Sequence, residues 1–78
     1  MAVEDTVKAV LNKVIDISVD DIKPDAGLED EYDVDSTEMV EIAVSLKKQL
    51  NLDIGDNELK KTHSFNDIVN ILKEKGVN

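Results

Sequence analysis

Ser36 is the residue of this sequence whose surroundings most invite a chemical role. It lies in the stretch YDVDSTEMVE, residues 32–41, among acidic residues and with no basic residue nearby. A serine nucleophile in an enzyme needs a base within hydrogen-bond reach and a group that orients this base. The only histidine, His63, has no evident carboxylate to orient it, and Ser36 is not in a Gly-x-Ser-x-Gly turn. Hydrolase activity is therefore disfavoured, and we expect no catalytic residue.

The acidic residues around Ser36 raise the alternative of a calcium site. An EF-hand loop that starts at Asp30 would place Glu41 at its twelfth position, as the pattern requires. Its third and fifth positions would be Tyr32 and Val34, which offer no carboxylate. Its sixth position needs glycine and would be Asp35. The pattern fails, and we expect no specific metal site.

A third use of Ser36 is as the anchor of an attached group. Asp35 and Glu38 have the spacing of a capping box at a helix start, with Asp35 as the cap. Ser36 would then be the first helical residue, with its hydroxyl free to face solvent. Val40 and Val44 follow at i+4 and i+8, on the same side of the helix.

Val40 and Val44 permit two interpretations. With Asp35, Glu38 and Glu41 around them they would form an apolar centre within a charged rim, which is common interface anatomy. They would equally fit the core, in contact with a neighbouring helix. The two roles are compatible, so the sequence leaves both open.

Apolar residues at helical spacing predict the elements that position this site. The spacing predicts helices over residues 3–16 and 36–50 and a last helix after Ser64. Ser64 and Asp67 have the spacing of a second capping pair at the start of this last helix, and Gly76 would occupy the C′ position at its end. The apolar positions of the three helices are Val3, Val7, Val10, Leu11 and Val14; Met39, Ile42, Ala43, Leu46 and Leu50; and Phe65, Ile68, Val69 and Leu72.

The connections between these helices are predicted to differ in structure. Residues 18–35 contain Pro24 and Gly27 and read as a long loop, which Val19, Ile22 and Leu28 would pin onto the core. Residues 56–61 read as a short helix that begins at Asp56 and turns Leu59 inward. The prediction is an all-α fold, a small bundle of three main helices plus one short helix.

Length and composition limit the class of protein. A chain of 78 residues is expected to form a single domain, residues 1–78, with a thin core. The absence of cysteine excludes disulfides and thiolate metal sites, and with the lack of a signal-peptide pattern it favours the cytoplasm. No apolar run approaches the roughly 20 residues that span a bilayer, so we expect no membrane insertion.

The net charge of −9 is concentrated around Ser36. Residues 25–41 hold eight acidic residues and no basic one. Such a surface repels nucleic acid phosphates and suits a basic protein patch. The simpler interpretation, that acidity keeps a small domain soluble, also stays open.

Three segments together resemble the acyl carrier protein family. They are VDSTEMVEIAVSLKKQL at residues 34–50, KPDAGLEDEYDVDS before it and LDIGDNELKKTHSFNDIVNIL after it, so the resemblance covers essentially the whole chain. Asp35-Ser36-Thr37 stands where the family has Asp-Ser-Leu.

The resemblance implies a carrier, not an enzyme. Ser36 would hold 4′-phosphopantetheine, transferred from coenzyme A by a phosphopantetheinyl transferase, and the arm would carry acyl groups as thioesters. Asp35, Thr37, Glu38, Val40, Glu41 and Val44 would contact partner enzymes that have basic patches and transfer or modify acyl groups. Fatty-acid, lipid or polyketide-type biosynthesis would be the setting, with the carrier a monomer. The acyl chain would fold back against Ala43, Ile54, Leu59 and Ile68, which fit the core equally well.

Several departures from the family pattern indicate a specialised carrier. Thr37 replaces the usual leucine, Asp33 a glycine and Gly55 a proline, while Lys47 and Lys48 stand where acidic residues are common. The two lysines would repel the basic patch of the usual partners or pair with an acidic patch on other partners. Neutral drift on a solvated face is the simpler alternative. Two other functions remain open, an unmodified helical interaction module and a carrier of amino acids or short acids.

Overall fold

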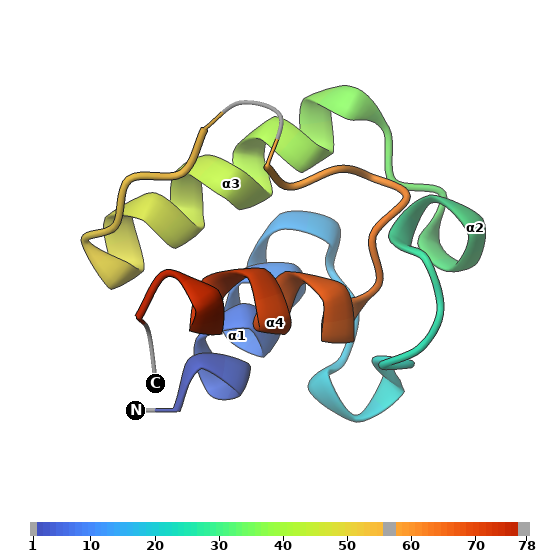
Figure 1. Ribbon diagram of the computed structural model, residues 1–78. Coiled ribbons are helices and arrows are strands. Elements are labelled where there is room, and N and C mark those ends of the chain that lie inside the picture. Colours follow the sequence, from blue (N-terminus) through green and yellow to red (C-terminus); the bar gives the residue numbers. More distant parts are fainter. Residues whose placement is uncertain (1, 56–57, 77–78) are drawn as a thin grey trace.

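Helices make up the regular structure of this chain. The computed structural model describes residues 2–55 and 58–76 (Figure 1). It contains three long helices, α1 (Val3–Ile15), α3 (Ser36–Leu50) and α4 (Phe65–Glu74), a short helix α2 (Leu28–Tyr32) and a 3₁₀ turn η1 (Val19–Asp21). No strand occurs within those two ranges. The predicted all-α bundle of three main helices and one short helix is confirmed.

Local chemistry sets where the helices end. Asp16, Asp33 and Asn51 follow α1, α2 and α3, and each has a positive φ, between 51° and 56°. Asp and Asn enter this left-handed region more readily than other non-glycine residues, so they can stop a helix there. Gly76 has a φ of 96° after α4, which confirms its predicted place at the helix end.

The core lies where the apolar faces of the three long helices meet. Its buried side chains come from all three long helices and from the connections between them. They are Val3, Val7, Val10, Leu11, Leu28, Val34, Met39, Ile42, Leu46, Ile54, Leu59, Phe65, Ile68, Val69 and Leu72. The predicted stripes are therefore largely confirmed, while Val14, Ala43 and Leu50 are only partly buried against this core.

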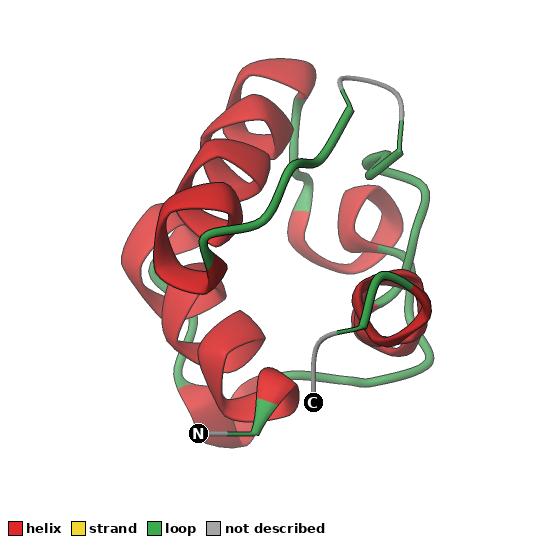
Figure 2. Cartoon of the chain, turned by 60° about the vertical axis from the view of Figure 1, so that its left-hand side comes forward, coloured by secondary structure: helices red, strands yellow, loops and turns green. Residues whose placement is uncertain are grey.

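Helix α1 packs against both α3 and α4 and so holds the bundle together. In Figure 1, α3 runs above α1, and α4 lies in front of it. Figure 2 views α4 almost end-on while α3 runs along the page, so these two helices are not parallel.

The connection between α1 and α3 is more ordered than the long loop predicted. It includes η1 and α2, and α2 is anchored by Leu28, whose side chain is fully buried. Ile22 is half-buried, but Val19 is 46% exposed, so the expectation that Val19 pins the connection to the core is wrong.

Backbone hydrogen bonds tie this connection to the segment before α4 and to the first turn of α4. Three N–H groups donate across the gap, from Leu28 to His63 O at 3.0 Å, from Glu29 to Lys61 O at 2.9 Å and from Asn66 to Pro24 O at 3.0 Å. The first two satisfy N–H groups at the start of α2, and the third satisfies one at the start of α4, because the first N–H groups of a helix have no partner within it. This pairing is non-local, which explains why sequence periodicity did not reveal α2.

The predicted short helix at residues 56–61 is wrong for the residues described. Residues 58–61 form turns, while Asp56, its predicted cap, lies outside the described residues. The Lys60 N–H donates to His63 Nδ1 at 3.0 Å, so a side chain takes a backbone group that a helix would use. The fold's short helix is α2.

Tyr32 links the two small elements of the first connection. Its hydroxyl accepts the Lys23 N–H at 2.6 Å and donates to Asp21 O at 3.4 Å. Lys23 also forms an ion pair with Glu31 at 2.7 Å. These contacts join the end of α2 to the last residue of η1 and to Lys23, which follows it.

Candidate functional site

Ser36 begins helix α3, and its neighbours close the helix end. The side chain of Asp35 accepts the Glu38 N–H at 2.8 Å, and the side chain of Glu38 accepts the Asp35 N–H at 3.1 Å. The predicted capping box is therefore confirmed, with Asp35 as the cap. Because Asp35 supplies the cap, the Ser36 hydroxyl has no structural task at this helix end.

The Ser36 side chain is accessible. Ser36 and Thr37 are both exposed, and the Ser36 hydroxyl makes no hydrogen bond within residues 2–55 and 58–76. An exposed hydroxyl at a helix start can accept an attached phosphate, because the helix dipole and free N–H groups there favour negative charge.

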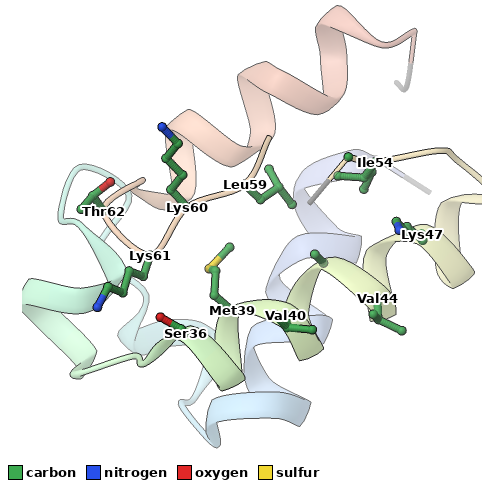
Figure 3. Close-up of a pocket in the computed structure, with 12 residues that line it drawn as sticks. Ser36, Met39, Val40, Val44, Lys47, Ile54, Leu59, Lys60, Lys61 and Thr62 are labelled. Carbon is green, nitrogen blue, oxygen red and sulfur yellow. The ribbon is translucent and has the colours of Figure 1, made fainter. Parts of the chain in front are cut away.

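A groove begins at Ser36 and follows α3. Its volume is about 450 Å³, which is within the range of small-molecule sites. One wall is α3 and the other is the segment before α4 (Figure 3). The residues that line it are Ser36, Met39, Val40, Ala43, Val44, Lys47, Ile54, Gly55, Leu59, Lys60, Lys61 and Thr62.

Val40 and Val44 form an exposed apolar ridge along α3. They are 62% and 41% exposed, so the interpretation of these valines as core residues is wrong. They line the groove on one side and, on the other, a smaller hollow formed with Lys13, Val14, Glu41 and Ser45. Together the two valines form an apolar patch on the surface of α3.

The acidic residues predicted to surround the ridge differ in how exposed their side chains are. Asp35 and Glu41 are exposed, whereas Glu38 is half-buried and its carboxylate is bonded within the cap. The Asp35 carboxylate is also bonded within the cap, so Glu41 has the most accessible carboxylate of the three. Their partner-binding role, like that of Thr37, stays a prediction.

A lysine stands close to the acidic side of the site. Lys61 forms an ion pair with Glu29 at 2.7 Å. The hydrogen bond and charge of Glu29 raise the pKa of Lys61, and the charge of Asp35 adds a smaller effect in the same direction. Lys61 thus brings positive charge to the start of the groove beside Ser36.

The residues predicted to line an acyl chain differ in their surroundings, and their contact with such a chain stays a prediction. Ala43, Ile54 and Leu59 line the groove, but Ile68 is fully buried in the core and does not. Sequence reasoning missed Lys60, Lys61 and Thr62, which belong to a connection without periodicity. Their approach to α3 depends on tertiary contacts, and no local signal marks it.

The described residues show neither a metal-binding cluster nor a membrane-spanning helix. Within residues 2–55 and 58–76 no three His, Cys, Asp or Glu side chains gather where they could hold a metal ion. None of the helices there has the length and apolar character needed to span a membrane.

Known proteins similar to this chain agree with one another. Residues 5–72 match the family described as "Phosphopantetheine attachment site". An acyl carrier protein of Desulforapulum autotrophicum is 30% identical over 76 residues, which cover 96% of this chain and 99% of the relative. One of Petrotoga mobilis is 30% identical over 69 residues, covering 88% of this chain and 81% of the relative. One of Acidothermus cellulolyticus is 32% identical over 63 residues, covering 81% and 75%.

Proposed function

The chain belongs to the acyl carrier protein family, and on this basis we propose that Ser36 is the residue that holds its phosphopantetheine arm. Membership confirms the resemblance found in the sequence. It also establishes that the chain is a carrier and not an enzyme, and that its cofactor is 4′-phosphopantetheine.

The observation that supports Ser36 most directly is its position at an exposed helix start beside an apolar groove. The cap is supplied by Asp35 and Glu38, so Ser36 can be esterified without loss of a helix-end hydrogen bond. In the transfer reaction the serine oxygen would form the new bond to phosphorus, and the nucleotide part of coenzyme A would leave. The residues around Ser36 therefore suit an attached phosphopantetheine group.

The attached arm supplies the thiol on which acyl groups are held as thioesters. The protein's part is presentation: α3 holds Ser36 at the surface, and the ridge of Val40 and Val44 offers an apolar contact beside it. Asp35 and Glu41 add negative charge around the ridge. This arrangement suits partner enzymes that have a basic patch around an apolar centre.

We propose that the partners are a phosphopantetheinyl transferase and the acyl-transferring or acyl-modifying enzymes of a fatty-acid, lipid or polyketide-type pathway. We also predict that the protein is a monomer and that it works in the cytoplasm. Thr37, in place of the family's leucine, would favour partners other than those of housekeeping fatty-acid synthesis.

The test is attachment followed by intact-mass measurement. The protein is incubated with coenzyme A and a phosphopantetheinyl transferase of broad specificity, and the mass of one phosphopantetheine group should be gained. Ser36→Ala should gain nothing, while Ser45→Ala, a change of the other serine on α3, should gain the full mass.

Each contrary result is informative. Modification of Ser36→Ala would place the arm on another residue. No gain by the wild type with several transferases would favour the unmodified interaction module. Loading of the modified chain by an enzyme that activates amino acids or short acids, instead of acyl chains, would identify the other type of carrier.

A further inference from the structure

The end of α3 that carries Ser36 is already negatively charged. Asp35 and Glu38 both have their carboxylates there, where each accepts a backbone N–H of the capping box. The surrounding stretch, residues 25–41, holds eight acidic residues and no basic one. Attachment of a phosphodiester at Ser36 brings one more negative charge to this end. A cation from another part of the chain would offset the added repulsion.

Lys61 is a cation that the fold brings to this end. It belongs to the segment before α4, and it lines the groove together with Ser36. Figure 3 shows its side chain directed toward α2 and the start of α3, whereas the side chain of Lys60 points away from α3. Glu29 raises the pKa of Lys61 most, and the charge of Asp35, the residue before Ser36, adds to this effect. Lys61 therefore lies within electrostatic reach of the site of attachment.

Glu29 holds Lys61 in this position without occupying it fully. The Glu29 N–H donates to Lys61 O at 2.9 Å, and the two side chains form an ion pair at 2.7 Å. These side chains are 40% and 39% exposed, so the pair is open to solvent and contributes little stability. A lysine ammonium group has three N–H donors, and Lys61 can therefore contact a second anion.

The chain between Glu29 and Ser36 is short and anchored at several points. The Asp33 N–H donates to Glu29 O at 3.0 Å where α2 ends, and Asp35 then caps α3. Between them Val34 is 1% exposed, so its side chain fixes this turn to the core. The position of the ion pair relative to Ser36 is thus set by backbone bonds and core packing, and not by the two long side chains alone.

We propose that Lys61 binds the phosphate of the arm held on Ser36, and that Glu29 competes with this phosphate for the Lys61 ammonium group. The inference rests on the attachment at Ser36 proposed above. In the unmodified chain Lys61 pairs with Glu29. In the modified chain Lys61 shares its ammonium group with the phosphate, and the Glu29 carboxylate becomes more available on the surface of α2. Partner enzymes would then meet a different charge pattern before and after attachment.

The experiment compares each variant before and after attachment. Wild type, Lys61→Met, Lys60→Met and Glu29→Gln are prepared unmodified and loaded from coenzyme A by a transferase, and intact mass confirms complete loading. The melting temperature of each form is measured at low salt. The quantity compared is the change on loading, so that the effect of a substitution on the unmodified chain cancels. Lys60→Met is the matched control, because it removes the charge of the neighbouring lysine in the same lining.

The change in melting temperature on loading should be about 2–4 °C less favourable in Lys61→Met than in wild type. This is the size expected of one partly exposed ion pair in a domain of this length. Lys60→Met should match the wild type. Raised salt should reduce the difference between Lys61→Met and wild type, because the pair is open to solvent.

Glu29→Gln tests the competition. Loading should be more favourable for this variant than for wild type, because Lys61 then has the phosphate as its anionic partner. The double variant Glu29→Gln, Lys61→Met should lose this gain. If Glu29 acted only by repelling the phosphate, the gain would persist without Lys61.

Side-chain NMR gives a readout that does not depend on stability. The CεH2 signals of Lys61 should shift on loading, and those of Lys60 should stay nearly unchanged. The phosphorus resonance of the loaded chain should differ between wild type and Lys61→Met.

Three results would overturn the proposal. They are an equal change on loading in wild type and Lys61→Met, an equal loss in Lys60→Met and Lys61→Met, and Lys61 signals that do not respond to loading. A gain in Glu29→Gln that persisted in the double variant would overturn the competition with Glu29. A wild type that gained no mass would instead contradict attachment at Ser36, so failure of the proposed function is distinguishable from failure of this inference.

Discussion

Asp35 and Glu38 bond each other's backbone across the first turn of α3, with Glu38 N–H to Asp35 Oδ1 at 2.8 Å and Asp35 N–H to Glu38 Oε1 at 3.1 Å. Replacement of Asp35 by alanine removes one of these bonds and should lower the free energy of unfolding by about 1 kcal/mol. Asp35→Asn keeps an acceptor and should cost much less. Urea unfolding distinguishes the two, and equal losses would mean that charge, not the cap, is responsible.

The exposed ridge on α3 leads to a prediction about partners. Val40→Ser should lower kcat/KM for a phosphopantetheinyl transferase about fivefold or more, the size of a moderately important interface contact. The melting temperature should change little, because Val40 is 62% exposed and serine has a similar helix propensity.

Val19 offers a matched control for this measurement. Like Val40, Val19 has an exposed side chain (46%), but it lies in η1 and does not line the groove. Val19→Ser should leave kcat/KM unchanged. An equal loss of kcat/KM in both variants would remove the argument for a specific ridge.

The left-handed backbone of Asp33 leads to a prediction about stability. Its φ of 55° ends α2 at the position where the resemblance to the family expects glycine. Asp33→Gly should raise the free energy of unfolding by about 0.5–1 kcal/mol, because glycine adopts this conformation without a Cβ clash. Asp33→Asn, which removes the charge and tolerates the conformation, should change it little. If Asp33→Asn raised the free energy of unfolding as much as Asp33→Gly, the effect would be due to the loss of charge.

The second capping box leads to a prediction about pH. The Asp67 carboxylate accepts the Ser64 N–H at 3.0 Å, and this backbone hydrogen bond lowers the pKa of Asp67 in the folded chain. In the unfolded chain the pKa is near the usual value of about 3.9. The stabilisation is therefore complete above about pH 5 and is lost as the pH falls through the unfolded and then the folded pKa.

Asp67→Asn isolates this contribution. Urea unfolding of wild type and variant between pH 7 and pH 3 should show a stability difference that is constant above about pH 5 and shrinks at the acid end. A difference that stayed the same down to pH 3 would contradict the assignment.

The excess of acidic residues leads to a prediction about salt. Of the eight acidic residues in 25–41, Glu29 and Glu31 form ion pairs, with Lys61 and Lys23. Since exposed pairs contribute little, screening of the remaining repulsion should dominate. The melting temperature should rise when salt or millimolar divalent ions are added at neutral pH. A fall on addition of salt would mean that the ion pairs outweigh the repulsion.

The elements that local chemistry determines could be predicted from the sequence. Helix α3 was predicted at residues 36–50 and is found there, because its apolar spacing and the Asp35 cap act within one stretch of chain. The pair of Ser64 and Asp67 was recognised for the same reason. The sequence also predicts that Ser36 is exposed, because Asp35 takes the capping role and leaves the serine hydroxyl free to face solvent.

The parts that depend on distant contacts could not be predicted. Helix α2 is only five residues long and is held by hydrogen bonds from Leu28 and Glu29 to residues of the segment before α4. The predicted helix after Asp56 failed within the described residues, where His63 takes the Lys60 N–H. Lys60, Lys61 and Thr62 of the groove could not be predicted because they belong to this irregular segment.

Tyr32 gives the molecule a built-in optical reporter. The sequence has one tyrosine and no tryptophan, so Tyr32 dominates the emission of the whole protein. Its hydroxyl is bonded to the backbone between η1 and α2, away from the residues that line the groove. Its fluorescence therefore follows the docking of this connection, while far-ultraviolet circular dichroism follows the three long helices. Any partial opening that frees the connection before the bundle melts would appear as two curves that fail to coincide.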